Sequence, residues 1–334
     1  MISWLKIAER SGVAEARRRA RRHAIALGFS STKVEHVAIA ATEAAHNLLR
    51  HAGGGDMLVQ AFGPPGGERL ALIALDDGPG IARLDRMLKD GASSMQSSGT
   101  GFGAMKRLSD KFDVFTAPGG GTVVTLEFRP DAAAGLRGVD VAALRQAYPG
   151  ERVCGDSVAL RGFPGFTLAF VCDGLGHGRR AAEAANHAYD AFLGSSNSNP
   201  AELLLEISAA MEGTRGGVGA VARIDTDAMT LTHAGVGNIT TMHMTQDKVK
   251  RLPVRDGYLG SSGRSPQTET VPLSSEDIIL MHSDGVSTLR GLERRAPLMQ
   301  RGALAIAARL MHDNLRGRDD ASIIALRLQP ALAL

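Results

Sequence analysis

The sequence predicts an α/β protein made of two consecutive domains, an α/β sandwich followed by a layered α/β/β/α sandwich. The chain has 334 residues, and at about 150 residues per domain this length favours two hydrophobic cores over one. Hydrophobic residues make up 44% and charged residues 22% of the chain, values near globular averages that exclude wholesale disorder and coiled-coil rods. Helix-forming and strand-forming segments occur in both halves, which favours layered α/β architectures.

Charge, cysteine content and hydropathy narrow the class of protein further. The formal net charge of +3 is too balanced to indicate a nucleic-acid or membrane-surface binder. The two cysteines, Cys154 and Cys172, form neither a disulfide framework nor a CxxC zinc pair. Residues 1–12 lack the apolar core of a signal peptide, and no run approaches the roughly 18 apolar residues that cross a bilayer. We therefore expect a soluble, cytoplasmic protein.

The first half is expected to contain two helices, a sheet and a third helix. Residues 13–27 and about 30–50 are rich in helix formers, and the second segment has apolar residues at three- and four-residue steps. A glycine triplet ends that segment. The remaining elements are strands at 57–62 and 69–75 around the turn GPPGG, a helix at 101–111, and a hairpin in which KFDVFTA and TVVTLEF flank PGGG.

The second half is expected to be dominated by long strands covered by helices. We place a first domain at 1–130, a short linker of small residues at 131–138 and a second domain at 139–330. Strand-like runs occur at 166–173, 217–225, 229–239, 277–285 and 321–328, and helix-like segments near 179–193, 200–212 and 300–314. Antiparallel strands with helices outside predict the α/β/β/α sandwich.

Three motifs in the first half point to a nucleotide. Glu43 and Asn47 stand four apart on the second helix, so both side chains project from one face. The strand 69–75 runs directly into DDGPG (76–80), where a carboxylate is followed by glycines that let backbone approach a flat ligand. The sequence GTGFG (99–103) opens a helix, whose amides can cradle phosphates. It lacks the lysine spacing of a P-loop.

In this order, EAAHN, DDGPG and GTGFG resemble the N, G1 and G2 boxes of the GHKL (Bergerat-fold) ATPases, over residues of about 7–129. Within that superfamily the chain is most similar to the small serine kinases of bacterial partner switching, the anti-sigma-factor kinases and the stressosome switch kinase. The segment KRLSDKFDVFTAPGGGTVVTLEF matches their closing helix and hairpin. The resemblance implies a Bergerat sandwich that binds ATP with Mg²⁺.

The same resemblance implies residue roles. Asn47 would hold Mg²⁺ on the triphosphate, Asp76 would bind the adenine amino group, and Glu43 would accept a proton from the attacking serine hydroxyl. His46 stands where these kinases usually carry Arg or Lys. The other nucleotide contacts would come from Gly78 and Gly80 in the base pocket and from Gly99, Thr100, Gly101 and Gly103 in the lid over the phosphates.

Four aspartates in the second half form a second candidate site. They are Asp156, Asp173, Asp284 and Asp319, and most of them end or follow apolar runs beside a glycine or a second acid. Carboxylates that converge from the ends of strands suit Mg²⁺ or Mn²⁺, which prefer oxygen ligands. Gathered without cations, they would repel one another. The pattern therefore predicts a metal site.

GDS, DGLGHG, GVGN, SDG and RDDAS resemble the metal-dependent protein phosphatases in order and spacing, over residues of about 140–328. The likeness is strongest to the SpoIIE and RsbX branch, which acts on phosphoserine. It implies two Mn²⁺ or Mg²⁺ ions bridged by Asp173 and a water between them as the nucleophile. The Gly174 carbonyl would ligate one ion, and Asp156, Asp284 and Asp319 would complete the shells directly or through water; Asp320 is an alternative to Asp319.

Several neighbouring residues admit more than one interpretation. Eukaryotic relatives place a candidate general acid, a histidine, directly after the DG dipeptide, whereas here Leu175 holds that position and His177 follows two later; the acid is left open. Cys154 and Cys172 lie near predicted ligands, but buried structural thiols are favoured over a redox switch. His233, His243 and His282 are likewise taken as structural, and Asn238 as a turn residue that shapes the site wall.

Together the two resemblances imply a bifunctional regulator of a partner-switching pathway, of the stressosome or anti-sigma kind. The first domain would phosphorylate a serine on a STAS-domain antagonist and the second would dephosphorylate it; further partner-switching proteins are expected as partners, and a homodimer is compatible with the kinase type. In the alternative, only the phosphatase is an enzyme and the first domain senses ATP and docks partners. A third interpretation makes both domains scaffolds, which the complete set of expected ligand residues disfavours.

Overall fold

The computed structural model describes residues 3–84, 101–130, 136–261 and 265–329. The chain divides into two compact units, one built mainly from residues 4–134 and the other from residues 135–334. Much of the expected linker, 131–135, lies outside the described residues. The domain boundaries at residues 130 and 139 stay a proposal, and each unit is described here by itself.

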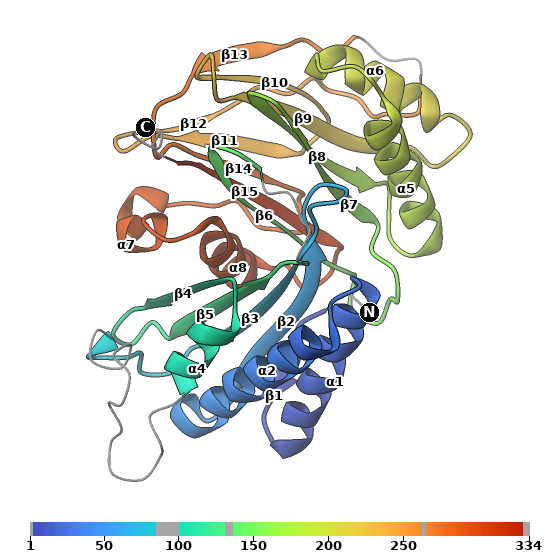
Figure 1. Ribbon diagram of the computed structural model, residues 1–334. Helices are drawn as coiled ribbons and strands as arrows, with labels where there is room; N and C mark the ends of the chain where they lie inside the picture. The colour runs from blue at the N-terminus through green and yellow to red at the C-terminus, as the bar shows by residue number, and fades with distance from the viewer. Residues whose placement is uncertain (1–2, 85–100, 131–135, 262–264, 330–334) are drawn as a thin grey trace. The chain divides into compact units, whose positions relative to one another are not determined.

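The N-terminal unit is an α/β sandwich with one antiparallel sheet in the order β1-β2-β3-β5-β4. Helices α1 and α2 pack against each other and against this sheet (Figure 1). The elements are β1 (Leu5–Ile7), α1 (Arg10–Ala26), α2 (Ser31–Ala52), β2 (Gly55–Phe62), β3 (Arg69–Asp76), α4 (Gly101–Leu108), β4 (Lys111–Thr116) and β5 (Thr122–Phe128). The predicted sandwich is confirmed, whereas the short strand β1 was not predicted.

Local sequence explains why α2 has these limits. The Ser30 side chain accepts a hydrogen bond from the Lys33 amide and caps the first turn. Gly53 ends the helix in the left-handed region at φ 70°, a conformation that costs glycine little. The apolar face of α2 is buried against the sheet, while Glu43 and Asn47 stay half-buried. The helix thus carries both polar side chains on a firmly packed support.

The C-terminal unit contains two five-stranded antiparallel sheets, in the orders β13-β10-β9-β8-β7 and β12-β11-β14-β15-β6. Helices α5 and α6 pack on the first sheet and α8 on the second (Figure 1), so the predicted α/β/β/α layering is confirmed. The first sheet and its helices are β7 (Asp156–Phe163), β8 (Phe166–Gly174), α5 (Arg179–Gly194), α6 (Pro200–Ala210), β9 (Gly217–Asp225), β10 (Thr230–Val236) and β13 (Glu269–Pro272). The second sheet and its helices are β6 (Val139–Gln146), β11 (Thr240–Met244), β12 (Val249–Arg251), β14 (Ile278–His282), η1 (Leu292–Arg295), α7 (Ala296–Met299), α8 (Ala303–Asn314) and β15 (Ala321–Leu328).

Register brings the predicted acidic residues to the ends of paired strands. Asp156 begins β7 and lies directly opposite Asp173 near the end of β8. On the other sheet, Asp284 follows β14 and Asp319 precedes β15, two strands that pair at these same ends. Apolar strand interiors therefore deliver carboxylates to a common edge in each sheet.

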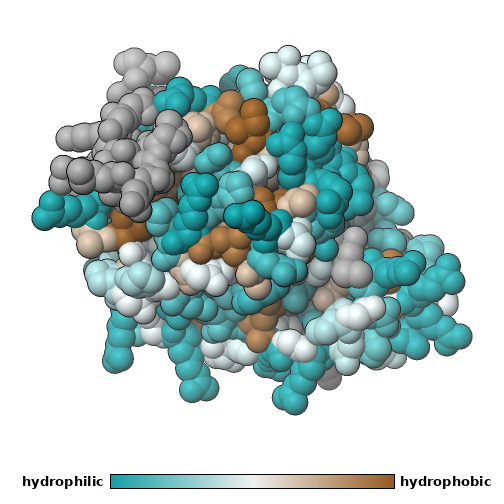
Figure 2. Space-filling model, turned by 90° about the horizontal axis from the view of Figure 1, so that it is seen from below, coloured by the Kyte–Doolittle hydropathy of each residue, from teal (hydrophilic) through white to brown (hydrophobic). Residues whose placement is uncertain are grey.

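The length and hydropathy of the helices show whether any of them could cross a membrane. Within the described ranges, every helix is too short or too polar to cross a lipid bilayer. The face of the molecule drawn in Figure 2 is mainly hydrophilic, and its hydrophobic patches are small and separate. Scattered apolar patches of this size are ordinary for a folded protein surface.

Candidate active sites

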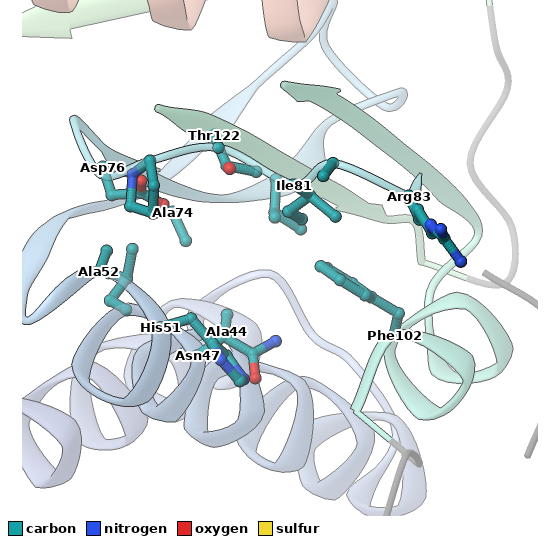
Figure 3. A pocket seen from close by; sticks show the side chains of 15 residues that line it. Ala44, Asn47, His51, Ala52, Ala74, Asp76, Ile81, Arg83, Phe102 and Thr122 are labelled. Atoms are coloured by element: carbon teal, nitrogen blue, oxygen red, sulfur yellow. The ribbon is translucent and has the colours of Figure 1, made fainter. Parts of the chain in front are cut away.

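A cavity of about 420 Å³ opens in the N-terminal unit between α2, the end of β3, the loop after it and α4 (Figure 3). Three predicted nucleotide contacts, Asn47, Asp76 and Gly80, line this cavity. The described lining also contains residues that sequence reasoning did not assign: Ala44, Leu48, His51, Ala52, Ala74, Pro79, Ile81, Ala82, Arg83, Phe102, Thr122 and Val124. A mostly apolar cavity with a few polar groups at defined places suits a planar base.

Asp76 occupies the last position of β3, opposite Thr122 on β5. Its Oδ1 accepts a hydrogen bond of 2.8 Å from the Gly78 amide, which fixes the carboxylate against the glycine turn. Figure 3 shows Asp76 and Thr122 on one wall of the cavity, with Asn47 on the wall formed by α2. Two polar side chains from one sheet and one from a helix therefore face the same space.

The loop that carries Gly78 and Gly80 is held by the β4–β5 hairpin. The Gly119 amide donates to the Pro79 carbonyl at 3.0 Å, and the Gly121 amide donates to the Gly78 carbonyl at 3.1 Å. Gly80 has φ 75°, and a Cβ there would collide with the carbonyl oxygen of Ala117. The PGGG turn, expected only to close the sheet, thus also shapes the cavity.

Glu43 and Asn47 lie beside the start of α4. A Cβ added at Gly101 would stand 3.6 Å from the Asn47 side-chain amide and 3.6 Å from Glu43 Oε2. Glu43 is not among the lining residues, although it adjoins them through this contact. A helix start next to a carboxylate and an amide can receive phosphates and a hydrated Mg²⁺.

The other residues expected in the lid over the phosphates do not share the position of Gly101. Gly103 is buried inside α4 and does not line the described cavity. Gly99 and Thr100 lie outside the described residues. Of the expected lid residues, only Gly101 adjoins Asn47 and Glu43 within the described part of the chain, and Gly101 does not line the cavity either.

The acidic site of the C-terminal unit is organised by Ser283. Its hydroxyl donates to Asp156 Oδ2 at 2.6 Å and accepts from the Ser322 amide at 3.0 Å. Asp156 itself is fully buried. This serine, which sequence reasoning passed over within the SDG motif, joins a strand of one sheet to two strands of the other.

Three further hydrogen bonds position the other carboxylates. Asn238 Nδ2 donates to Asp284 Oδ2 at 2.9 Å, so the residue predicted to shape the site wall bonds a predicted ligand directly. Asp320 Oδ1 accepts from the Tyr148 amide at 2.8 Å, and Asp319 Oδ1 accepts from the Asp320 amide at 3.0 Å. Asp320 is buried while Asp319 is half-buried, and both carboxyl groups belong to the cluster.

Burial and neighbouring charges both raise the pKa of two carboxyl groups in this cluster. Burial raises the pKa of Asp173 to about 9, with further contributions from Asp156, Asp284, Asp319 and Asp320. Burial also raises the pKa of Asp156 to about 7, against the opposing hydrogen bond from Ser283. In the absence of cations, neighbouring negative charges and the low-dielectric setting thus disfavour ionisation of Asp173 and Asp156.

The donor set suits a hard cation. Asp156 Oδ1, Asp284 Oδ1 and Asp320 Oδ2 are buried and have no hydrogen-bond partner within the described part of the chain. In the same part, no three acidic, histidine or cysteine side chains are grouped closely enough to hold one ion by themselves. A cation here needs carbonyl and water oxygens as well, which is how Mg²⁺ usually binds.

The structural interpretation of the cysteines and of two histidines agrees with their surroundings. Burial raises the thiol pKa of Cys154 and Cys172, which opposes thiolate reactivity. His243 Nε2 lies 2.7 Å from Asp277 Oδ2, and His282 Nδ1 lies 2.9 Å from the Ser283 carbonyl oxygen. Such buried and hydrogen-bonded surroundings are those expected of structural side chains.

Two family models match the chain. The histidine kinase-like ATPase domain matches residues 8–128, and stage II sporulation protein E (SpoIIE) matches residues 164–329. The serine/threonine-protein kinase RsbT of Bacillus subtilis is 31% identical over 122 residues, which cover 36% of this chain and 92% of RsbT.

The C-terminal half has its own relatives. The phosphoserine phosphatase RsbX of Bacillus subtilis is 24% identical over 140 residues, 41% of this chain and 70% of RsbX. A crystal structure of RsbX in complex with magnesium has a TM-score of 0.53 at 19% identity, covering 59% of this chain and 98% of that one. A chain described under "The bacterial stressosome: a modular system that has been adapted to control secondary messenger signaling" has a TM-score of 0.53 at 27% identity, covering 57% and 99%.

Proposed function

Because this chain belongs to the family of the RsbT serine/threonine kinases and also carries a SpoIIE phosphatase domain, we propose that it both adds and removes one regulatory phosphate. The N-terminal domain (1–130) phosphorylates a serine of a STAS-domain antagonist in a cytoplasmic partner-switching pathway, and the C-terminal domain (139–330) dephosphorylates it. The observation that supports this proposal is the presence, in one chain, of a nucleotide-sized cavity and a separate buried carboxylate cluster.

The phosphatase half rests on the acidic cluster. Asp156, Asp173, Asp284 and Asp319, with the Gly174 carbonyl, would hold two Mn²⁺ or Mg²⁺ ions, and RsbX, a relative, has been crystallised with magnesium. Such ions supply an acidified water and neutralise phosphoryl charge. Ser283 would hold Asp156 in place through its 2.6 Å hydrogen bond.

The kinase half rests on the cavity and on the contact with Gly101. Asp76 and Gly80 would bind adenine, Asn47 would orient Mg²⁺ on the phosphates, and Glu43 would take the proton of the substrate serine hydroxyl. Glu43 Oε2 stands 3.6 Å from a Cβ position at Gly101, a placement that supports reach toward the phosphate end. Positioning and charge neutralisation would supply most of the catalysis.

Two observations favour the alternative in which the N-terminal unit senses ATP without transferring phosphate. Glu43 stands outside the described cavity lining, and His46 replaces the basic residue usual at its position. ATP binding would then dock partners and control the phosphatase. Glu43→Gln separates the two: it abolishes phosphate transfer in the first case and leaves ATP binding and phosphatase control unchanged in the second.

The direct test uses the full chain. Asp173→Asn protein, incubated with Mg²⁺, γ-labelled ATP and a STAS-domain protein encoded near its gene, should place label on one serine; wild-type protein with Mn²⁺ should then remove it. The matched control is Glu43→Gln combined with Asp173→Asn, which should label nothing while still binding ATP. Absence of label with Asp173→Asn, despite measurable ATP binding, contradicts the kinase role for that substrate.

A further inference from the structure

A second cavity, of about 530 Å³, lies in the C-terminal unit between α6 and the loop that joins β12 to β13. Its lining includes the buried side chains of Leu204 and Leu259. It also includes Leu205 and Tyr258, which are 45% and 50% exposed. Large apolar side chains left in contact with solvent around one hollow are typical of a surface that binds another molecule. We call this cavity the α6 groove.

Hydrogen bonds hold the two sides of the α6 groove in place. The Gly260 amide donates to Ser208 Oγ on α6 at 3.0 Å, which ties the loop to the helix. The Leu259 amide donates to the Gly217 carbonyl at 2.6 Å, and the Gly217 amide donates to the Leu259 carbonyl at 3.1 Å, which ties the same loop to the start of β9. The groove is therefore formed before a ligand binds, and this lowers the entropic cost of binding.

Gly217 also connects the α6 groove to the acidic cluster. In the pairing of β8 with β9, Gly217 lies opposite Gly174 and Val218 lies opposite Asp173. Leu259, which lines the groove, is thus bonded to the residue opposite Gly174, whose carbonyl is a proposed metal ligand. A protein chain with its phosphoserine at the acidic cluster can therefore place a neighbouring segment in the groove.

The charge of the α6 groove indicates which segment fits. Glu212 and Asp256 line it and are exposed, and neither carboxylate makes a hydrogen bond or an ion pair within the described residues. The described lining contains no basic side chain, since Arg215 and Arg255 lie outside it. Two unpaired carboxylates beside exposed apolar side chains complement a segment that carries Lys or Arg next to apolar residues.

We propose that the α6 groove is a docking site for the phosphorylated protein substrate and binds a segment in which Lys or Arg stands next to apolar residues. The inference rests on the proposed phosphatase function and adds a preference for the sequence around the phosphoserine. Apolar side chains of the segment pack against Leu205 and Tyr258. Its basic side chains lie against Glu212 and Asp256. Docking raises the effective concentration of the phosphoserine at the acidic cluster, so its effect is on KM.

Two phosphoserine peptides of equal length test the charge preference. On both sides of the phosphoserine, one alternates Leu with Lys and the other alternates Leu with Glu, so the position of the docking segment need not be known. With Mn²⁺, the full wild-type chain should hydrolyse the Lys peptide with a KM about tenfold lower, and high salt should reduce this difference. Glu212→Lys combined with Asp256→Lys should reverse the preference.

Glu183→Lys combined with Asp190→Lys is the matched control. Both acids are exposed on α5 and lie outside the described lining of the α6 groove. The control changes the net charge by the same amount as the groove variant, so it should keep the wild-type preference. Tyr258→Ala tests the apolar contact and should raise KM for both peptides, with thermal unfolding of the variant as the check on its fold.

Binding without hydrolysis separates docking from catalysis. A fluorescent Lys peptide with serine in place of phosphoserine should bind the wild-type chain in an anisotropy titration, and should bind Glu212→Lys with Asp256→Lys about tenfold more weakly. If the peptide binds in this way but wild-type protein with Mn²⁺ hydrolyses neither phosphopeptide, the proposed phosphatase function fails, and with it the role of the groove in dephosphorylation. Hydrolysis of both phosphopeptides with equal KM overturns the docking site and leaves the phosphatase function standing.

Two other results also overturn the inference. One is a peptide preference that stays unchanged in the groove variant, or that reverses equally in the α5 control. The other is a second copy of this chain as the occupant of the groove. Sedimentation would then show a dimer in wild type that is lost in Glu212→Lys with Asp256→Lys, while the peptide preference stays the same.

Discussion

His233 makes the C-terminal unit sensitive to acid at the scale of a single side chain. It lies on β10, is fully buried, and neither ring nitrogen has a partner within the described residues. Burial lowers its pKa to about 4, and Glu269 on the neighbouring strand opposes this only in part. The sheet therefore accommodates the neutral imidazole and excludes the charged one.

The sign of the pH dependence follows from this. Below its ordinary pKa of about 6.5 the unfolded chain binds a proton that the native state binds only near pH 4, so stability falls as pH falls across that interval. The full loss of unfolding free energy below both pKa values is about 3.5 kcal/mol, at about 1.4 kcal/mol per pKa unit. Leucine at position 233 cannot be charged. Denaturant unfolding at pH 7 and 4.5 should therefore show that this loss of stability is absent in His233→Leu.

The test compares the pH dependence of the unfolding free energy in wild type with that in His233→Leu. This comparison is needed because the carboxyl groups around Asp173 titrate over the same pH range and change stability in the opposite direction. An unchanged difference in unfolding free energy between pH 7 and pH 4.5 after the substitution would contradict the role of His233.

At the scale of the element, the β4–β5 hairpin contains two glycines that can be compared directly. Gly119 and Gly121 both have positive φ, 67° and 73°. A Cβ at Gly119 meets nothing within 4 Å, whereas one at Gly121 would collide with the Asp76 carbonyl oxygen. The turn thus has room for a side chain at position 119 but not at position 121.

We expect Gly119→Ala and Gly121→Ala to share the cost of a left-handed non-glycine residue, about 1–2 kcal/mol. Gly121→Ala should in addition displace Asp76 and lower nucleotide affinity by tenfold or more at about 1.4 kcal/mol per decade. Isothermal titration with ATP, beside thermal unfolding of both variants, measures the two effects. Equal affinities in the two variants would show that the hairpin does not hold the cavity.

The pairing of β3 with β5 brings together a buried ion pair. Arg69 Nη1 lies 2.8 Å from Glu127 Oε2, and the two side chains are 5% and 2% exposed; Arg69 also stacks on Phe62. Glu127→Ala should destabilise the N-terminal unit by about 3–5 kcal/mol, because it leaves a buried guanidinium unpaired.

Replacing both members, Arg69→Met with Glu127→Leu, should cost much less in chemical denaturation, since no charge stays buried. The exposed pair of Glu15 with Arg18 is the control, and Glu15→Gln should change stability by about 0–1 kcal/mol. A single variant no less stable than the double one would exclude the pair as a stabilising contact.

The sequence predicts features that depend on neighbouring residues better than contacts between residues far apart in the chain. The aspartates at the ends of β7, β8 and β14 were predictable because each follows or begins an apolar strand in its own short segment. The Ser283 to Asp156 bond, the Asn238 to Asp284 bond and the stacking of Tyr148 on His177 join residues from 29 to 127 positions apart, so no local pattern announces them. Helix ends shifted by up to three residues: α1 begins at Arg10 and α4 ends at Leu108, where helix and turn propensities are closely balanced.

At the scale of the whole molecule, the two opposed activities that we propose for one chain would imply continuous turnover. With ATP, Mg²⁺, Mn²⁺ and a STAS-domain substrate, the wild-type protein should reach a constant, partial phosphorylation while ADP continues to form. Asp173→Asn should instead drive phosphorylation to completion, after which ADP formation stops. A coupled ADP assay alongside phosphoprotein quantification checks both curves, and ADP formation that ceases at the plateau in wild type would contradict a cycle.

The hydrogen bonds of the Ser283 hydroxyl link the proposed phosphatase site to the relative position of the two sheets. It donates to a carboxylate of one sheet and accepts from an amide of the other, so the proposed dephosphorylation site lies across the interface between the two sheets of the sandwich. Packed layers slide by small shear movements, and a displacement shorter than one hydrogen bond would separate Asp156 from its partner. We therefore expect a force applied to either helical layer to slow the proposed phosphate removal without anything entering the site.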